Sequence, residues 1–226
     1  MEKLEAKLQT FLDCLDKSRE PTIEEVVSFE ETLKELFNLK RKGLADLVAI
    51  RKNEALSAED ENLLRDYSKR LKRDLLNFCL DIVDVIDQQV LPNIQSAHGR
   101  VFFLKIKGDF YRYSAEFLKK GEGHFNRVFQ EGVKAYESAH QIANAELPCE
   151  SLIYLNLCLN YSVFYYKIAR NTLKACEVIL QTLYKLNHEM DAIPEEIQKT
   201  IQPTKCLLEN NLMLWASEIK EKKYSH

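Results

Sequence analysis

Apolar residues recur every three or four positions along nearly the whole chain, which is the spacing of an amphipathic α-helix. In the first segment, Leu4, Leu8, Phe11 and Leu15 share one helix face in this way. Prolines, glycines and capping residues interrupt the pattern, and no β-strand pattern competes with it. The pattern predicts helices over residues 1–17, 22–53, 57–91, 96–119, 126–145, 150–169, 171–190 and 196–220.

The segments between these helices are only a few residues long, so consecutive helices should pack as antiparallel neighbours. A chain of 226 residues is long enough for one large domain, and its six glycines and five prolines leave few places for turns. We therefore expect an all-α fold of about eight to nine antiparallel helices in one domain, residues 1–220. A flexible polar tail, residues 221–226, should follow it.

Composition and charge argue against several classes of protein. Charged residues make up 30% of the chain but the formal net charge is −3, so we expect no nucleic-acid partner. No apolar run is as long as a membrane span, and the N-terminus is too charged for a signal peptide. The six cysteines form no C-x-x-C pair and are typical of free, mostly buried thiols in a cytoplasmic protein. Neither they nor the five histidines cluster as ligands, so we expect no metal site and no cofactor.

One stretch, residues 100–113 (RVFFLKIKGDFYRY), combines a dense apolar mass with a ridge of charge. Its apolar residues are numerous enough to bury most of a helix, while Lys105, Asp109 and Arg112 stack at i, i+4 and i+7. Charges on a largely buried helix are unfavourable unless each has a partner. The ridge therefore has two interpretations. It forms an internal ladder of ion pairs, or the carboxylate orients the cations and one of them faces a groove in which it binds an anion.

Three motifs resemble those of the 14-3-3 phosphopeptide-binding proteins. Residues 101–113 (VFFLKIKGDFYRY) are similar to the family's VFYLKMKGDYYRY, residues 157–168 (LCLNYSVFYYKI) to LALNFSVFYYEI, and residues 207–215 (LLENNLMLW) to LLRDNLTLW. The motifs occur in the family's order, and the resemblance covers most of the chain after about residue 21. It implies an all-helical domain with a concave groove that holds phosphoserine or phosphothreonine segments.

The resemblance also implies a phosphate site made of one lysine, two arginines and a tyrosine. These match Lys34, Arg41, Arg112 and Tyr113. The chemistry is coherent, because guanidinium groups grip phosphate oxygens through paired hydrogen bonds, while the lysine adds a point charge and the tyrosine donates a hydroxyl. Without the resemblance, the lysine and arginine at 34 and 41 would be an ordinary solvated helix face.

Further residues are implied to hold the rest of the bound segment. Asn160 and Asn211 match the family's two asparagines that bind the peptide backbone, since an amide side chain can donate and accept at once. Lys105 would flank the phosphate. The apolar wall opposite would consist of Leu159, Val163, Leu207 and Trp215.

Two departures from the family's typical sequence affect this groove. Lys167 stands where the family has a glutamate, which removes an acceptor and adds positive charge. Pro203 and Thr204 replace apolar residues one turn before Leu207, so the wall should be weaker or reshaped.

A third departure concerns the dimer. Tyr67, Arg70 and Asp74 match the surface on which family members lay the first helix of a partner. The N-terminus is shorter by about one helix, so the complement of that surface is missing or rebuilt within residues 1–17. We therefore expect a homodimer weaker than the family norm, with the apolar face of the first segment making any remaining self-contact.

Together these features predict a cytoplasmic adaptor that binds phosphorylated client proteins, with no nucleic-acid or membrane partner. The alternative is a helical interaction scaffold of the same fold that has lost phosphate dependence. An enzyme is disfavoured, because we find no nucleophile–base pair, metal cluster or glycine-rich phosphate loop.

The last residues suggest a further ligand. The family also accepts a phosphorylated residue that stands one or two places before a free carboxylate, and Ser225 has this position, downstream of Lys222 and Lys223. Phosphorylated Ser225 would then be a self-ligand; the alternative is a disordered polar tail.

Overall fold

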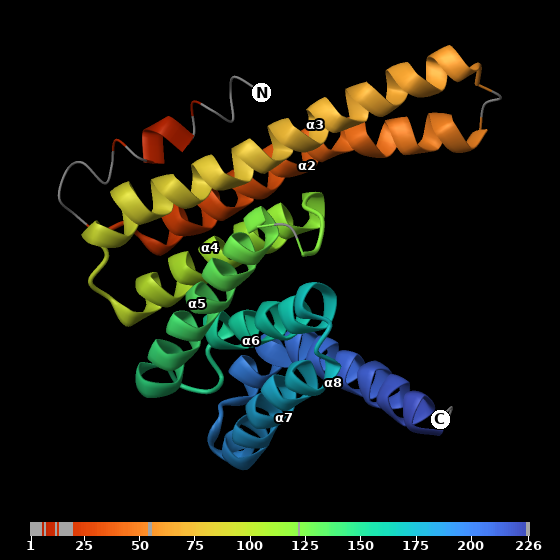
Figure 1. The fold of residues 1–226 in the computed structure, drawn as a ribbon. Helices are drawn as coiled ribbons and strands as arrows, with labels where there is room; N and C mark the ends of the chain where they lie inside the picture. The colour runs from red at the N-terminus through yellow and green to blue at the C-terminus, as the bar shows by residue number, and fades with distance from the viewer. Residues whose placement is uncertain are drawn as a thin grey trace. The chain divides into compact units, whose positions relative to one another are not determined.

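The computed structural model describes residues 6, 8–11, 13, 20–53, 56–121 and 123–224, and every regular element within them is helical (Figure 1). The predicted all-α class is confirmed. The chain divides into two compact units. The first unit is Met1–Ile94 with Phe117–Lys119, and the second unit is Gln95–Glu116 with Lys120–His226.

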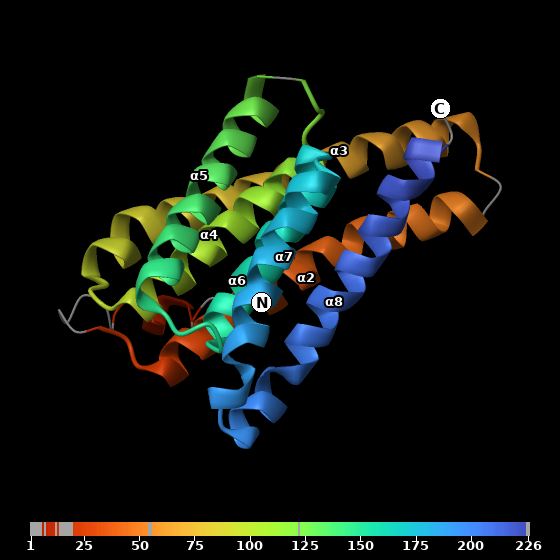
Figure 2. The same cartoon turned by 90° about the horizontal axis from the view of Figure 1, so that it is seen from below.

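The first unit is built on two long helices, α2 (Ile23–Asn53) and α3 (Ala58–Val85), which lie side by side as a hairpin (Figures 1 and 2). The start of α2 is fixed by a capping box. The backbone N–H of Thr22 donates to Oε2 of Glu25 at 2.9 Å, and the N–H of Glu25 donates back to Oγ1 of Thr22 at 3.3 Å. Ser57 caps α3 in the same manner, accepting from a backbone N–H three residues on.

Apolar side chains on the facing sides of α2 and α3 form the core of the first unit. The helical residues near the N-terminus contribute Phe11, which is buried with its ring 4.3 Å from the ring of Phe29. From the hairpin come the buried residues Phe29, Leu33, Leu36, Phe37, Leu47, Leu75, Cys79, Ile82 and Val83.

The second unit contains α4 (Ala97–Phe117), α5 (Gly123–Glu146), α6 (Leu152–Phe164), α7 (Thr172–Glu189) and α8 (Glu195–Tyr224). Phe117, the last residue of α4, is counted with the first unit. Helix α6 is apolar nearly all round and contacts α5, α7 and α8 (Figures 1 and 2). A helix of this kind is stable only when it is surrounded, so α6 forms the centre of this unit.

Several predicted helix ends differ in the structure. The segment predicted to be helical over 57–91 is an α-helix only to Val85 and then continues as a π-helical turn, Ile86–Val90. The segment predicted to be helical over 150–169 is an α-helix only to Phe164 and then continues as a π-helical turn, Tyr165–Ala169, closed by Arg170 at φ 57°. The last helix does not stop at Lys220 but runs to Tyr224, with Pro203 inside it. Ser225 lies outside the described residues.

Two expectations from composition can be compared with the structure. No helix in the described parts of the chain is long and apolar enough to cross a membrane. Free thiols were expected to be mostly buried, and this is confirmed for Cys79, Cys149, Cys158 and Cys176, whereas Cys206 is exposed.

Candidate functional site

The central feature of the second unit is the buried carboxylate of Asp109 on α4, of which only 5% is exposed. Its Oδ2 atom lies 3.2 Å from Nζ of Lys105, one turn earlier on the same helix, and accepts a hydrogen bond of 2.9 Å from Nδ2 of Asn160 on α6. Its Oδ1 atom accepts a hydrogen bond of 2.6 Å from the hydroxyl of Tyr136 on α5. One carboxylate therefore connects three helices.

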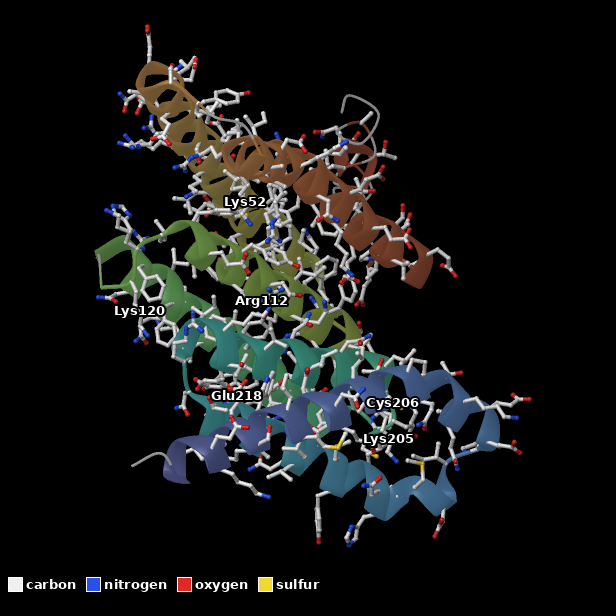
Figure 3. All side chains as sticks on the ribbon, turned by 90° about the vertical axis from the view of Figure 1, so that its right-hand side faces the viewer. Lys52, Arg112, Lys120, Lys205, Cys206 and Glu218 are labelled. Atoms are coloured by element: carbon white, nitrogen blue, oxygen red, sulfur yellow. The ribbon has the colours of Figure 1, made fainter. Side chains whose placement is uncertain are left out.

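Arg112, one turn after Asp109, is held much more loosely. Its guanidinium lies 3.6 Å from Oδ1 of Asp109 and 3.6 Å from Oε1 of Glu116, which is too long for a hydrogen bond. Its Nε atom is buried without a hydrogen-bond partner. The face of the guanidinium lies over the ring of Tyr113, 4.3 Å from the centroid. Arg112, labelled in Figure 3, is thus a nearly buried cation with donor capacity to spare.

The ionisation of these groups follows from their neighbours. Burial alone would raise the pKa of Asp109, but the positive charges of Lys105 and Arg112 outweigh it and hold the pKa below its ordinary value. Burial raises the pKa of Tyr136 well above its usual range, so its hydroxyl keeps its proton and donates. The site at neutral pH therefore contains an ionised Asp109 and two cations, and the Glu116 carboxyl group also lies near Arg112.

Both readings of the charged ridge on residues 105–112 describe part of this arrangement. Lys105 is only 4% exposed and forms a buried ion pair with Asp109, as a ladder requires. Arg112 is oriented by the same carboxylate without being satisfied by it. A guanidinium oriented in this way can bind an oxyanion through hydrogen bonds.

The other two cations predicted for the phosphate site belong to the first unit. Lys34 and Arg41 lie seven residues apart on α2, which places them on one face of that helix two turns apart, and both are exposed. Nζ of Lys34 is 2.8 Å from Oε1 of Glu30, and this pair is weak because the lysine is 58% exposed. Their joint role with Arg112 and Tyr113 stays a prediction.

Several residues predicted to hold the peptide lie on α6 and the turn that follows it. Leu159, Asn160 and Val163 are partly exposed, and Lys167 is exposed in the π-helical turn. Leu159, Val163 and Lys167 recur at i, i+4 and i+8, and Asn160 is next to the first of them, so they occupy one side of this helix. The structure thus brings these four residues to one helix face.

The residues predicted on α8 differ in their exposure. Leu207 is 52% exposed and Asn211 is partly exposed, whereas Trp215 is only 3% exposed. The Trp215 ring stacks on that of Tyr166 with 4.5 Å between centroids, and the Tyr166 hydroxyl donates to Glu218 at 2.7 Å. Trp215 is therefore packed inside the unit and is not exposed at its surface.

Glu218 is labelled on α8 in Figure 3, several turns after Lys205 and Cys206. Its hydrogen bond with Tyr166 attaches this later part of α8 to the π-helical turn after α6. The sequence did not indicate this contact, because it joins residues 52 positions apart.

The predicted dimer surface lies on α3. Tyr67, Arg70 and Asp74 are all exposed there, with Tyr67 52% exposed. On the N-terminal side, Phe11 is buried within its own chain against Phe29 and is not presented to a partner. Leu4 and Leu15 of the same predicted face lie outside the described residues.

One group among the described residues has the composition of a metal site. Cys149, Glu150 and Glu189 bring a thiol and two carboxylates within 4.8 Å of one another. The Cys149 thiol is close enough to donate to either carboxylate, at 3.6 Å and 3.3 Å. Burial and the two acidic neighbours raise the pKa of this thiol to about 12, so it stays protonated at neutral pH, and hydrogen bonding accounts for the cluster.

Comparison with known proteins agrees with the motifs. The family described as 14-3-3 protein matches residues 2–216. The chain is 32% identical over 222 residues to "14-3-3-like protein GF14 iota" of Arabidopsis thaliana, covering 97% of this chain and 82% of that protein. It is 34% identical over 222 residues to "14-3-3-like protein B" of Vicia faba, covering 97% and 84%. A tobacco relative, "14-3-3-like protein D" of Nicotiana tabacum, is 33% identical over 217 residues.

The buried ion pairs predict a large effect of neutralising Asp109. The Asp109→Asn variant should lower the free energy of unfolding by about 3 kcal/mol, because Lys105 and Arg112 would remain buried without a counter-charge. Urea denaturation measures this. The folded-state pKa of Asp109 is lowered, so its carboxylate stabilises the fold fully above the unfolded-state pKa of about 4. The difference in unfolding free energy between the two chains should therefore be largest there and should shrink as the pH falls through the folded-state pKa.

A matched control is Asp66→Asn on α3. Asp66 also pairs with a lysine, Lys69 at 2.9 Å, but both side chains are 65% exposed. Its stability should stay close to that of the unsubstituted chain. Equal, small losses in the two variants would show that Asp109 is not the electrostatic centre of the unit.

Proposed function

This chain belongs to the 14-3-3 family, and from this premise we propose that it binds phosphoserine- or phosphothreonine-containing segments of client proteins in the cytoplasm. Family membership supports an adaptor role in general, in which a protein regulates its partners by binding them rather than by catalysis. The finer assignment to named residues is part of the proposal.

The main support for this proposal is the Nε atom of Arg112, which is buried without a hydrogen-bond partner. A nearly buried donor without a partner costs about 1–3 kcal/mol, and a phosphate group would remove that cost by accepting two parallel hydrogen bonds from the guanidinium. Tyr113, whose ring supports the guanidinium, carries a hydroxyl that suits the same oxyanion. Lys34 and Arg41 are proposed to supply the remaining positive charge.

The peptide on either side of the phosphate is proposed to be held by amides and apolar side chains. Asn160 uses one of its two N–H donors on Asp109, and an amide has a second donor and an acceptor oxygen for a peptide backbone. Asn211 is proposed to act likewise from α8. Lys167 adds an exposed positive charge in the position of a family glutamate, so acidic residues in the client should be tolerated nearby.

The second candidate, a scaffold that binds without phosphate, has one supporting observation. Leu207 and Leu214 lie seven residues apart on α8 and are 52% and 56% exposed. Apolar side chains on one helix face favour an apolar partner whether or not it is phosphorylated. Phosphate dependence therefore separates the two functions, and the state of Arg112 favours the first.

Removing either arginine should weaken binding without unfolding the chain. Each charge-assisted contact to phosphate is worth roughly 1.5–3 kcal/mol, so Arg112→Ala or Arg41→Ala should weaken the affinity for a phosphoserine peptide at least about tenfold. Calorimetric titration measures this, with circular dichroism to verify helicity. Arg65→Ala, an exposed arginine on α3, is the control and should bind normally. Unchanged affinity in both test variants would refute the phosphate-site assignment.

Self-association is proposed to be weak and to respond to the C-terminus. Because Phe11 is buried within its own chain, sedimentation at low micromolar concentration should show substantial monomer. Because α8 is helical to Tyr224, that residue lies only about 14 Å beyond Trp215, which is a shorter reach than an extended tail would have. Phosphorylated Ser225 is therefore proposed to bind a second copy of the chain rather than its own. Phosphorylation of Ser225 should then increase the oligomer. A dimer that persists at nanomolar concentration would contradict the first statement, and an unchanged sedimentation profile would contradict the second.

A further inference from the structure

Tyr136, on α5, reaches the centre of the charged site from a fixed position. Its side chain is completely buried, and its ring lies 5.4 Å from the rings of both Tyr161 and Phe164. On the other side is Gly108, where even a single added carbon would come within 2.8 Å of the Tyr136 ring. Packing therefore determines where the hydroxyl points, and it points at Oδ1 of Asp109.

The Tyr136 hydroxyl and the Arg112 guanidinium approach the same oxygen of the Asp109 carboxylate. The hydroxyl donates to Oδ1 of Asp109 at 2.6 Å, and the guanidinium of Arg112 lies 3.6 Å from the same oxygen. Hydrogen bonding with Tyr136 is also among the influences that raise the pKa of Arg112 against the effect of burial. A hydroxyl can donate a hydrogen bond to an anion and accept one from a cation at the same time.

The other carboxylate oxygen is already in use. Oδ2 of Asp109 takes Lys105 and Asn160, at 3.2 Å and 2.9 Å. The side of the carboxylate onto which Arg112 could close is therefore Oδ1, where Tyr136 donates.

We propose that Tyr136 is a positioning residue for phosphate binding, which acts as a spacer that keeps Arg112 from closing onto Asp109. This inference rests on the proposed function. With the hydroxyl in place, the guanidinium stays oriented by the carboxylate but keeps its donors for the ligand. Without it, Arg112 would shorten its 3.6 Å separation to a charge-assisted hydrogen bond of about 2.8 Å, and an incoming phosphate would have to break that bond.

The test is Tyr136→Phe, which keeps the ring and removes only the hydroxyl. Its affinity for a phosphoserine peptide should fall about threefold to tenfold, whereas the affinity for the unphosphorylated peptide should not change. The matched control is Tyr154→Phe, because Tyr154 is equally buried and its hydroxyl donates to Asn144 at 2.9 Å, away from Asp109. The control should lose similar stability and bind normally.

A second measurement separates positioning from a general loss of stability. The pKa of the bound phosphoserine, followed by phosphorus NMR, should be lowered by the guanidinium in the unsubstituted chain and in Tyr154→Phe. In Tyr136→Phe it should return towards the value of the free peptide. If Tyr136→Phe does not fold, Gly108→Ala takes its place, since the added carbon pushes on the same ring and should shift the phosphate pKa in the same direction.

The outcomes distinguish this inference from the function on which it rests. If Arg112→Ala loses phosphopeptide affinity while Tyr136→Phe retains both the affinity and the phosphate pKa, the spacer role is wrong and the proposed function stands. If Arg112→Ala also binds normally, the phosphate-site assignment fails and the spacer role fails with it.

Discussion

The second unit depends on one buried negative charge. Asp109 receives Lys105 from its own helix, the Tyr136 hydroxyl from α5 and the Asn160 amide from α6. Taking a carboxylate out of water is strongly unfavourable, and only this complete set of donors makes it stable. Because the donors come from three helices, the charge fixes how those helices meet. The same requirement leaves the nearby Arg112 oriented but not satisfied.

This division of roles connects stability with function. Lys105 is buried and its charge is neutralised by a direct ion pair, so it contributes to the fold. Arg112 has contacts of 3.6 Å and an unpaired Nε, so part of its interaction energy is left for a ligand. A cation that is already desolvated and oriented loses little entropy when a phosphate arrives, which is the advantage of preorganisation. Under the proposed function, the fold itself would keep Arg112 available for phosphate.

Much of the fold could be predicted from the sequence, because the signals are local. The spacing of apolar residues and the interrupting capping residues placed α2 within one residue of its observed start. The π-helical turn at Tyr165–Ala169 was not predicted, since it has the same apolar pattern as the α-helix before it. The extension of α8 to Tyr224 was also missed, because polar residues at a chain end resemble a tail as much as a solvated helix.

The candidate site was predictable only in part, for a similar reason. Asp109 and Arg112 are three residues apart, and their spacing revealed the ridge. Tyr136 contacts Asp109 across 27 residues and from another helix, and no periodicity predicts such a contact. Gly108 gave no signal either, since its small size matters only because the Tyr136 ring occupies the adjacent space. Contacts of this kind depend on how helices cross, which the chain's own pattern does not specify.

Binding is proposed to depend on phosphate, and calorimetric titration with paired peptides measures this dependence. The two peptides should have the same sequence and differ only in one phosphoserine or serine. With at least two charge-assisted contacts to phosphate, the account predicts that the phosphorylated peptide binds at least about a hundredfold more tightly. Equal affinities for the two peptides would contradict it and would leave a helical scaffold that recognises its partners without phosphate.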